Sequence, residues 1–172
     1  MQQNSTVKTD KARDQLQKQA TASAGFACYH VDRCRTQACC HKQVYVLLLR
    51  NKGGYWDFAK GCEEKCDGGD LLKTAYRELK EETGLLASDI NPLTPAVFHM
   101  YEYRVGDKLK RVKLFLAQLN KSIFKKAVKL RYDSNEIFSH RFVPLRKLHT
   151  YFFWKEDKQV ARAIQQTLLR MV

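Results

Sequence analysis

The sequence has few acidic side chains and no long hydrophobic run. Aspartate and glutamate together number 18 in 172 residues, against 31 lysines and arginines, and the net charge is +13. No apolar run reaches the length of about 18 residues that a membrane-spanning helix needs, and the first residues lack the hydrophobic segment of a signal peptide. We therefore expect no membrane insertion and a soluble, cytoplasmic protein, with the nucleus left open as the other compartment. The positive charge predicts an anionic partner: a polyphosphate, a nucleic acid such as RNA, or an acidic membrane surface.

The cysteines follow none of the usual patterns. Several of them gather with two histidines early in the chain, but the paired Cys-x-x-Cys units of a zinc site are missing, so we expect reduced thiols and keep a structural zinc as the weaker alternative. Cys62 and Cys66 flank a later loop and could pair, although an intracellular setting argues against a disulfide. No histidine or asparagine partner of a nucleophilic cysteine can be assigned. The early group is Cys28, His30, Cys34, Cys39, Cys40 and His41.

Acidic side chains are nevertheless concentrated in one predicted helix. Asp70 is a favourable N-cap and Gly84 a favourable residue beyond the C-terminus. At about 100° per residue, three glutamates fall on one arc beside an apolar arc that must face a core. Such carboxylates repel one another unless a cation lies between them, and oxygen ligands favour magnesium or manganese; a solvated face is the alternative. The glutamates are Glu78, Glu81 and Glu82, with Arg77 at their edge, and the apolar side chains are Leu71, Leu72, Ala75, Tyr76 and Leu79.

The order of residues here resembles the signature of the Nudix hydrolases. That pattern runs Gly, five residues, Glu, seven residues, and then Arg-Glu-aliphatic-x-Glu-Glu-x-Gly-aliphatic, and residues 77–85 match its second half throughout. The first half departs from it. Gly69 stands where the first Glu is expected, and Gly61 lies too far upstream, which indicates an insertion in the loop. Asp67 and Asp70 are the two candidates to replace the missing Glu.

Other segments resemble the Nudix subgroup that hydrolyses diadenosine tetraphosphate. Trp56 and the Lys60-Gly61 pair match its lead-in to the signature, which implies that Lys60 contacts phosphate; Trp56 has core packing as its alternative. Tyr101 and Tyr103 lie where the subgroup has a tyrosine that stacks on adenine, although strands are rich in tyrosine in any case. Lysines and arginines crowd the next strand and the segment after it, as a phosphate cleft needs. They are Lys108, Lys110, Arg111, Lys113, Lys121, Lys125, Lys126, Lys129 and Arg131, of which Lys113 is our candidate substrate contact.

The resemblance also implies the roles of the acidic residues. Glu136 stands in a loop before an aromatic-containing strand, where the subgroup has a further metal ligand or general base. A carboxylate, either Glu82 or Glu136, is implied to take a proton from the attacking water, and Arg77 to orient a glutamate. The implied metal ligands are Glu78, Glu81, Glu82, Gly61 and Glu136, the catalytic residues are Glu82, Glu81, Glu136 and Arg77, and the cofactor is Mg²⁺ or Mn²⁺.

The remaining pattern predicts an α/β fold. Strands are expected at 23–31, 43–50, 96–105, 108–119 and 137–143, the second one buried on both faces. From Trp154 onward, Val160, Ala163, Ile164 and Leu168 have helical spacing. Residues 1–22 are polar and predict a disordered or loosely helical tail before a single domain at 23–172. This order suits a mixed sheet between helices, and the resemblance implies a Nudix-type α/β/α sandwich around a mixed β-sheet.

Together these features predict Mg-dependent hydrolysis of a phosphoanhydride bond in a nucleoside-diphosphate-linked substrate. A dinucleoside polyphosphate such as diadenosine tetraphosphate is the first candidate. The alternatives among enzymes are an RNA 5′-end pyrophosphohydrolase or decapping enzyme and a diphosphoinositol polyphosphate phosphohydrolase. An alternative of another class is a catalytically inactive Nudix fold that binds nucleotides or RNA, because the first half of the signature is altered.

Overall fold

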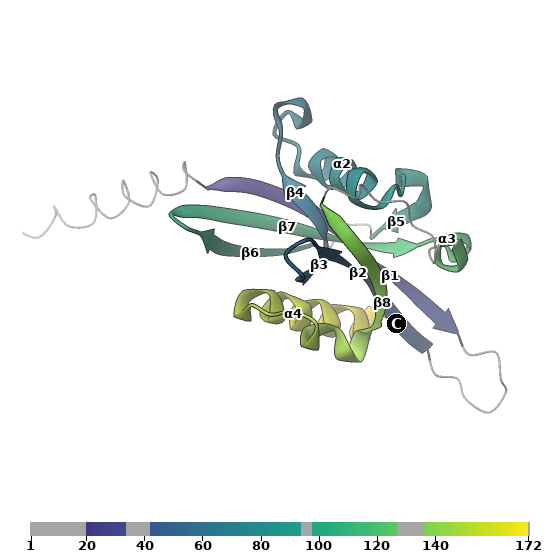
Figure 1. Ribbon diagram of the computed structural model, residues 1–172. Coiled ribbons are helices and arrows are strands. Elements are labelled where there is room, and N and C mark those ends of the chain that lie inside the picture. Colours follow the sequence, from purple (N-terminus) through teal and green to yellow (C-terminus); the bar gives the residue numbers. More distant parts are fainter. Residues whose placement is uncertain (1–19, 34–41, 94–97, 127–135, 172) are drawn as a thin grey trace, which may run out of the picture.

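One mixed sheet of eight strands runs through the protein, with helices on both of its faces (Figure 1). The structure, a computed structural model, describes residues 20–33, 42–93, 98–126 and 136–171. The strands are β1 (Thr21–Arg33), β2 (Lys42–Asn51), β3 (Trp56–Asp57), β4 (Ala59–Cys62), β5 (Ile90–Pro92), β6 (Phe98–Val105), β7 (Lys108–Leu119) and β8 (Ile137–Pro144). The helices are α2 (Leu71–Thr83), α3 (Lys121–Lys126) and α4 (Lys155–Met171), with short 3-10 turns η1 (Lys65–Asp67), η2 (Ala87–Asp89) and η4 (Leu145–Thr150).

The first strand lies at the centre of this sheet. β1 pairs in parallel with β7 and antiparallel with β2 and β4. β7 also carries β5 and β6, and β2 carries β3 and β8, all of them antiparallel. One parallel pair among antiparallel ones makes the sheet mixed, which confirms the predicted fold class.

Each face of the sheet has its own apolar core, because successive side chains of a strand point to opposite faces. Val46 and Leu48 of β2 pack toward α4, whereas Leu47 and Leu49 pack toward α2. All of these side chains are buried, so the prediction of a strand covered on both faces is confirmed. Figure 1 shows α2 and α4 on opposite sides of the sheet. The α/β/α sandwich is thereby confirmed as well.

The predicted caps define the helix that carries the glutamates. The carboxylate of Asp70 accepts hydrogen bonds from the amides of Leu72 at 2.9 Å and Lys73 at 3.4 Å. Gly84 ends the helix with φ of 71°, a left-handed conformation that favours glycine. Ala75 and Leu79 are buried against β1, and the glutamates follow on the adjoining arc. Local signals alone therefore place this helix correctly.

The C-terminal helix confirms three of its four predicted core contacts. Val160, Ile164 and Leu168 are buried under the sheet. Ala163 is only half-buried, and Ala161 is fully buried instead, because the apolar arc of α4 is turned slightly from the one expected. Among the residues that the structure describes, none of the helices combines the length and the apolar character that crossing a bilayer requires.

Several segments differ from the sequence-based expectation. β1 begins at Thr21, inside the predicted tail, and three short strands, β3, β4 and β5, form where only loops were expected. They form because neighbouring strands offer free backbone groups; β4, for example, pairs with β1 from Ser23 to Phe26. Other predictions lie outside the described residues. These concern the tail at 1–19, Cys34, Cys39, Cys40, His41, the strand start at 96–97, Lys129 and Arg131, and the side chains of Lys125 and Lys126 are likewise not described.

Candidate active site

The glutamates of α2 face a polar cleft of about 690 Å³, which we call the carboxylate cleft. β4 forms one wall of the cleft and α2 another. Glu136, directly before β8, joins them, and its carbonyl accepts a hydrogen bond from the Lys52 amide at 3.1 Å. The cleft is lined by Lys60, Gly61, Cys62, Glu64, Arg77, Glu78, Glu81, Glu82, Lys110, Glu136 and Ile137. The tertiary structure thus brings together every residue that the sequence suggested as a metal ligand.

Two of these glutamates are largely withdrawn from water. The Glu82 carboxylate accepts a hydrogen bond from the Lys60 amide at 3.0 Å. Burial raises the pKa of Glu82 to about 8, and the charge of Glu78 adds to the rise. Burial also raises the pKa of Glu78, against the opposing effect of Arg77, and the charges of Glu81 and Glu136 push it in the same direction. Burial and the neighbouring carboxylates therefore both oppose ionisation of Glu78 and Glu82.

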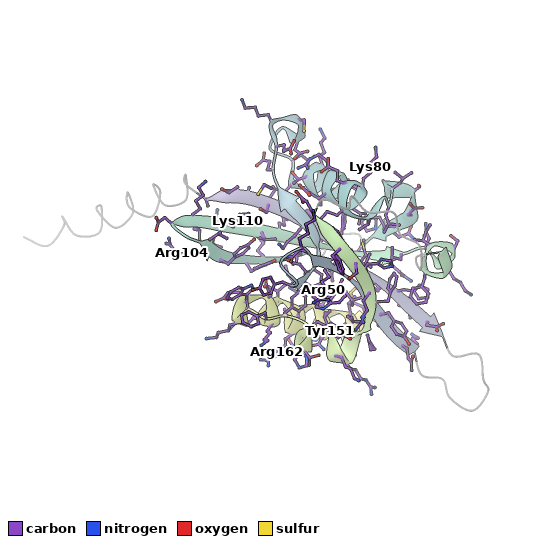
Figure 2. All side chains as sticks on the ribbon, in the orientation of Figure 1. Arg50, Lys80, Arg104, Lys110, Tyr151 and Arg162 are labelled. Carbon is purple, nitrogen blue, oxygen red and sulfur yellow. The ribbon has the colours of Figure 1, made fainter. Side chains whose placement is uncertain are left out.

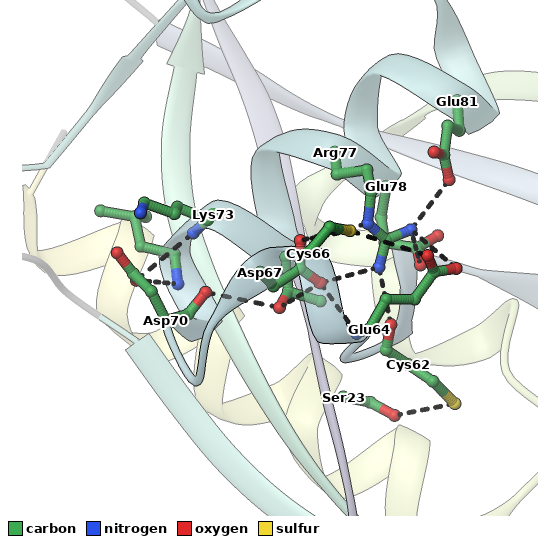
Figure 3. Close-up of polar contacts among 12 residues, drawn as sticks. Ser23, Cys62, Glu64, Cys66, Asp67, Asp70, Lys73, Arg77, Glu78 and Glu81 are labelled. Carbon is green, nitrogen blue, oxygen red and sulfur yellow. Dashed lines mark hydrogen bonds and ion pairs between the residues drawn. The ribbon is translucent and has the colours of Figure 1, made fainter.

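Arg77 connects the helix to the preceding loop (Figure 3). One guanidinium nitrogen, Nη1, donates to Glu78 at 2.8 Å and to Glu81 at 2.9 Å. The other, Nη2, donates to the carbonyl of Cys62 at 2.7 Å. Because a planar guanidinium fixes the direction of each of its bonds, Arg77 orients both glutamates relative to β4.

Asp67 is the loop carboxylate that lies against this arginine. Its two oxygens accept from Arg77 Nη2 at 3.0 Å and Nε at 3.3 Å, and Thr74 donates to it at 3.0 Å. The hydrogen bond from Arg77, together with one from the Glu64 amide, lowers the pKa of Asp67 to about 2. Asp70, the other candidate for the missing signature Glu, caps the helix instead. The insertion is thus accommodated by η1, which brings Asp67 back to Arg77.

We expect Asp67→Asn to lower the free energy of unfolding at neutral pH. In acid the difference between the variant and the wild type should become smaller. A carboxyl whose pKa falls on folding stabilises the fold above its ordinary value near 3.8, and this contribution is lost as the pH falls toward about 2. The difference in free energy of unfolding between wild type and variant should therefore shrink between about pH 4 and pH 2. Urea denaturation at several pH values measures it.

Asp70→Asn is the matched control, because asparagine caps helices as well as aspartate does. Its free energy of unfolding should stay close to that of the wild type at neutral pH. If Asp67→Asn lowered the free energy of unfolding by the same amount at every pH, the ion pair with Arg77 would not be the cause of the loss.

Position 61 requires glycine because the Glu78 side chain lies against its backbone, not because of an unusual backbone conformation. A Cβ atom placed on Gly61 would overlap the carboxylate of Glu78. Glu78 can occupy its position only because residue 61 has no side chain. The same residue is the one whose carbonyl we predict to be a metal ligand. This glycine keeps β4 and α2 close enough to form one cleft.

The residues of the carboxylate cleft fit a hard divalent cation. Their donors are oxygens, which Mg²⁺ and Mn²⁺ prefer, and the pKa values of Glu78 and Glu82 are raised by burial first and by neighbouring carboxylates second. Arg77 fills the space between Glu78 and Glu81, and in the described part of the chain no three His, Cys, Asp or Glu side chains already converge on one point. Arg77 bonds one oxygen of Glu78 and one of Glu81, which leaves the second oxygen of each carboxylate for a cation.

A second cleft of about 1030 Å³, the aromatic cleft, opens beside the first. Lys60 lines both of them, with its backbone amide bonded to Glu82 of the first cleft and its ammonium group paired with Asp57 of the second. Burial by itself lowers the pKa of Lys60, but the Asp57 carboxylate, 2.8 Å from its ammonium group, raises that pKa well above the usual value. The remaining lining consists of Asn51, Tyr55, Trp56, Asp57, Glu102, Tyr103, Arg104, Val105, Leu109, Phe153, Trp154, Glu156 and Asp157.

The predicted substrate contacts are divided between the clefts and the core. Trp56 lines the aromatic cleft, with the guanidinium of Arg141 5.4 Å from the centre of its ring. Tyr103 also lines it, whereas Tyr101 stacks on Tyr103 at 6.0 Å and is not part of the lining. Lys113 lines neither cleft and lies over Phe115 on the α2 face of the sheet.

Lys110, rather than Lys113, is the lysine of β7 that reaches the carboxylate cleft. Its ammonium group lies 3.6 Å from the Cys62 sulfur. Strand alternation separates the two lysines, since Lys113 shares its face with Phe115 while Lys110 has the parity of Val112, but it does not by itself place Lys110 beside α2. Lys110 and Arg104, both labelled in Figure 2, belong to the half of the sheet that carries the β6–β7 hairpin.

The sequence also missed the C-terminal wall of the aromatic cleft. Phe153 and Trp154 come directly before α4 and Glu156 and Asp157 from its first turn, where the sequence showed only an amphipathic helix. Their one local signal was a run of aromatic side chains, Tyr151 to Trp154, directly before the helix.

The described cysteines have different surroundings. Cys28 is buried, and burial raises the pKa of its thiol to about 12. Cys62 lines the carboxylate cleft and Cys66 is exposed on η1. All three are free thiols.

Comparison with known proteins agrees with this geometry. The family model of the NUDIX domain matches residues 24–164. Among solved structures, a binary complex of the Caenorhabditis elegans Ap4A hydrolase superposes with a TM-score of 0.71 at 20% identity, covering 87% of this chain and 98% of that one. The NUDIX domain of Shewanella oneidensis NrtR with ADP ribose gives 0.60 at 14% identity, covering 87% and 88%. An Escherichia coli dihydroneopterin triphosphate pyrophosphohydrolase gives 0.54 at 12% identity, covering 86% and 98%.

At these identities the solved structures show the fold alone, and the family rests on the domain match. That match covers most of the chain, including both walls of the carboxylate cleft and the complete second half of the signature. The chain therefore belongs to the NUDIX family, and it is an enzyme of the Nudix hydrolase class.

Proposed function

We propose that this enzyme hydrolyses a phosphoanhydride bond in a dinucleoside polyphosphate such as diadenosine tetraphosphate, with Mg²⁺ or Mn²⁺. One observation carries the proposal: Lys60 lines both the carboxylate cleft and the aromatic cleft. A substrate with a nucleoside in one cleft would have its phosphate chain pass Lys60 and reach the glutamates. The similarity to the C. elegans Ap4A hydrolase structure supports this choice of substrate.

The carboxylate cleft supplies the ligands for the cation. Glu78, Glu81, Glu82, Glu136 and the carbonyl of Gly61 would hold it. When bound, a divalent cation neutralises phosphate oxygens and lowers the pKa of water. Its binding requires ionised carboxylates, and its charge favours that form of Glu82 despite the raised pKa of this side chain.

The other roles fall to side chains at the edge of the same cleft. Glu82 or Glu136 would accept the proton of the attacking water. Arg77 orients Glu78 and Glu81 rather than touching the substrate. Lys60 and Lys110 both line this cleft, and their ammonium groups would contact phosphate oxygens.

The aromatic cleft would hold the nucleoside. Tyr103 lines it and would stack on the base, with Tyr101 supporting it from behind. Trp56 would form another part of the wall. Aromatic side chains suit this task because every nucleobase has a π-face on which they can stack.

An RNA 5′ end is the second candidate, favoured by the net charge of +13. NrtR of Shewanella oneidensis, similar in fold at 15% identity, has been solved with DNA. A protein that binds RNA through many phosphates loses affinity steeply with salt. Affinity for a 5′-triphosphorylated RNA at low and moderate salt would therefore reveal this function.

A substrate panel tests the proposal. Purified protein with Mg²⁺ is given diadenosine tetraphosphate, capped and triphosphorylated RNA, and a diphosphoinositol polyphosphate, and products are separated by ion-exchange chromatography. We expect the dinucleotide to be the best substrate and a chelator to abolish its turnover. The variants Glu81→Gln and Glu82→Gln should lose this activity. Preference for another substrate, or no turnover of any, would overturn the proposal, and the latter would leave a nucleotide-binding module.

A further inference from the structure

Three aromatic side chains at the mouth of the aromatic cleft are unusually exposed. Phe153 is 65%, Trp154 53% and Tyr55 43% accessible to solvent. They contact one another, with ring centres 4.8 Å apart for Phe153 and Trp154 and 5.7 Å apart for Phe153 and Tyr55. Exposed aromatic clusters at a cavity are typical of ligand sites, and flat rings favour a flat ligand.

The aromatic cleft is also lined by acidic side chains, which stacking on a base does not require. Asp57 is paired with Lys60, and Glu102 with Arg111 at 2.7 Å. Asp157 is half-buried in the cleft and, within the described part of the chain, has no hydrogen bond or ion pair. Burial and the charge of Asp57 raise the pKa of Asp157 to about 6, against the opposing effect of the Lys60 charge.

The position of Asp157 in the first turn of α4 explains part of this. Acidic residues there interact favourably with the helix dipole, and Glu156 and Asp157 both do so. That interaction does not require Asp157 to line a cavity. Among the described residues no group donates a hydrogen bond to the Asp157 carboxylate, so its oxygens are available to a ligand that presents donors.

We propose that the aromatic cleft selects a purine base by its hydrogen-bond donors, with Asp157 accepting from N1–H and the 2-amino group of guanine. The inference rests on the proposed function, since it names the base that the polyphosphate substrate carries. Guanine presents two adjacent donors on this edge, which a carboxylate can accept together. Adenine presents one donor beside an acceptor nitrogen, which a carboxylate repels.

The rest of the lining is consistent with this orientation. Tyr103, Phe153 and Trp154 line the same cleft as Asp157, so a base stacked in it can direct its edge to the carboxylate. Glu156, exposed at the rim, is a second acceptor for the 2-amino group. The phosphates then leave toward Lys60, which lines both clefts.

Binding without catalysis tests the selection. GMP and AMP are titrated by calorimetry into the full chain in the presence of a chelator, so that no turnover occurs. GMP should bind about tenfold more tightly, the discrimination of one good bidentate contact. Asp157→Asn should abolish this preference, and Asp107→Asn, which removes one charge at the β6–β7 turn outside both clefts, should retain it. Equal affinities in the wild type, or a preference that survives in Asp157→Asn, would overturn the inference.

Two further variants separate the edge contact from stacking and from folding. Trp154→Ala should weaken GMP and AMP by similar factors, because stacking does not distinguish the two purines. Asp157→Ser removes the carboxylate with a residue that suits helix starts, and it replaces Asp157→Asn if thermal unfolding shows that variant to be misfolded. Loss of the preference in Asp157→Ser supports the inference, and its persistence contradicts it.

Turnover distinguishes this inference from the proposed function. Equal hydrolysis of diguanosine and diadenosine tetraphosphate, with equal affinity for GMP and AMP, would refute the base selection and leave the hydrolase proposal intact. A GMP preference without hydrolysis of any dinucleoside polyphosphate would refute the function and leave the base site.

Discussion

Glu82→Gln is expected to lower kcat about 10³-fold, within the range of 10²–10⁴ that a positioned base contributes. Glutamine has nearly the same shape as glutamate but can neither accept a proton nor supply a negative ligand. Its carbonyl oxygen can still accept the hydrogen bond from the Lys60 amide, now 3.0 Å long. Folding should be retained or improved, since the wild-type carboxylate is buried at a cost that its raised pKa reveals.

Steady-state kinetics with diadenosine tetraphosphate and Mg²⁺, together with urea denaturation, measure these two effects. Glu63→Gln is the matched control, because Glu63 lies in the same stretch of chain but lines neither cleft. It should keep wild-type kinetics. A Glu82→Gln enzyme with kcat within a few-fold of the wild type would show that Glu82 neither accepts the proton nor binds the cation.

Gly61→Ala is expected to reduce kcat/KM by about 10²-fold, the effect of displacing a reacting group by about 1 Å. The added methyl group would occupy the place of the Glu78 carboxylate. A carboxylate is the mobile end of its side chain, so it can move aside, whereas the backbone of β4 need not. We therefore expect the free energy of unfolding to change by less than about 1 kcal/mol.

Kinetics and urea denaturation of the same preparation separate the two effects. The fall in activity should exceed what the fraction of unfolded protein explains. A fully active Gly61→Ala enzyme would mean that the Glu78 position is unimportant. A large loss of stability with activity per folded molecule preserved would mean that the glycine serves the sheet instead.

The helix of the glutamates shows how far local sequence can determine structure. Asp70 and Gly84 cap it, and its apolar and acidic arcs follow from helical periodicity, so each feature depends on residues a few positions apart. The alternation of β2 and β7 and the turn at Gly106 are of the same kind. Local rules also explain where a prediction was only partly right. Ala163 was predicted to face the core, but α4 is turned slightly, so that Ala161 is buried there instead.

Whether Asp67 or Asp70 would meet Arg77 depended on the path of the inserted loop. Both aspartates are close enough in sequence, and only the η1 turn, with its Gly68 and Gly69 at positive φ, brings Asp67 to the guanidinium. Asp70 is the N-cap of α2, and its carboxylate is bonded to the first amides of that helix. A choice between two plausible partners was therefore made by tertiary contacts rather than by spacing.

By itself, the sequence determined the fold class, the glutamate-bearing helix and the family, because caps, periodicity and the signature are local. The tertiary structure decided which other residues lie in the clefts with the glutamates. Lys60, Lys110 and Asp157 come from β4, β7 and α4 and Glu136 from the turn before β8, and strand register and packing bring them to two clefts that share one lysine. Such contacts depend on long-range pairing, for which one sequence has no short-range signal.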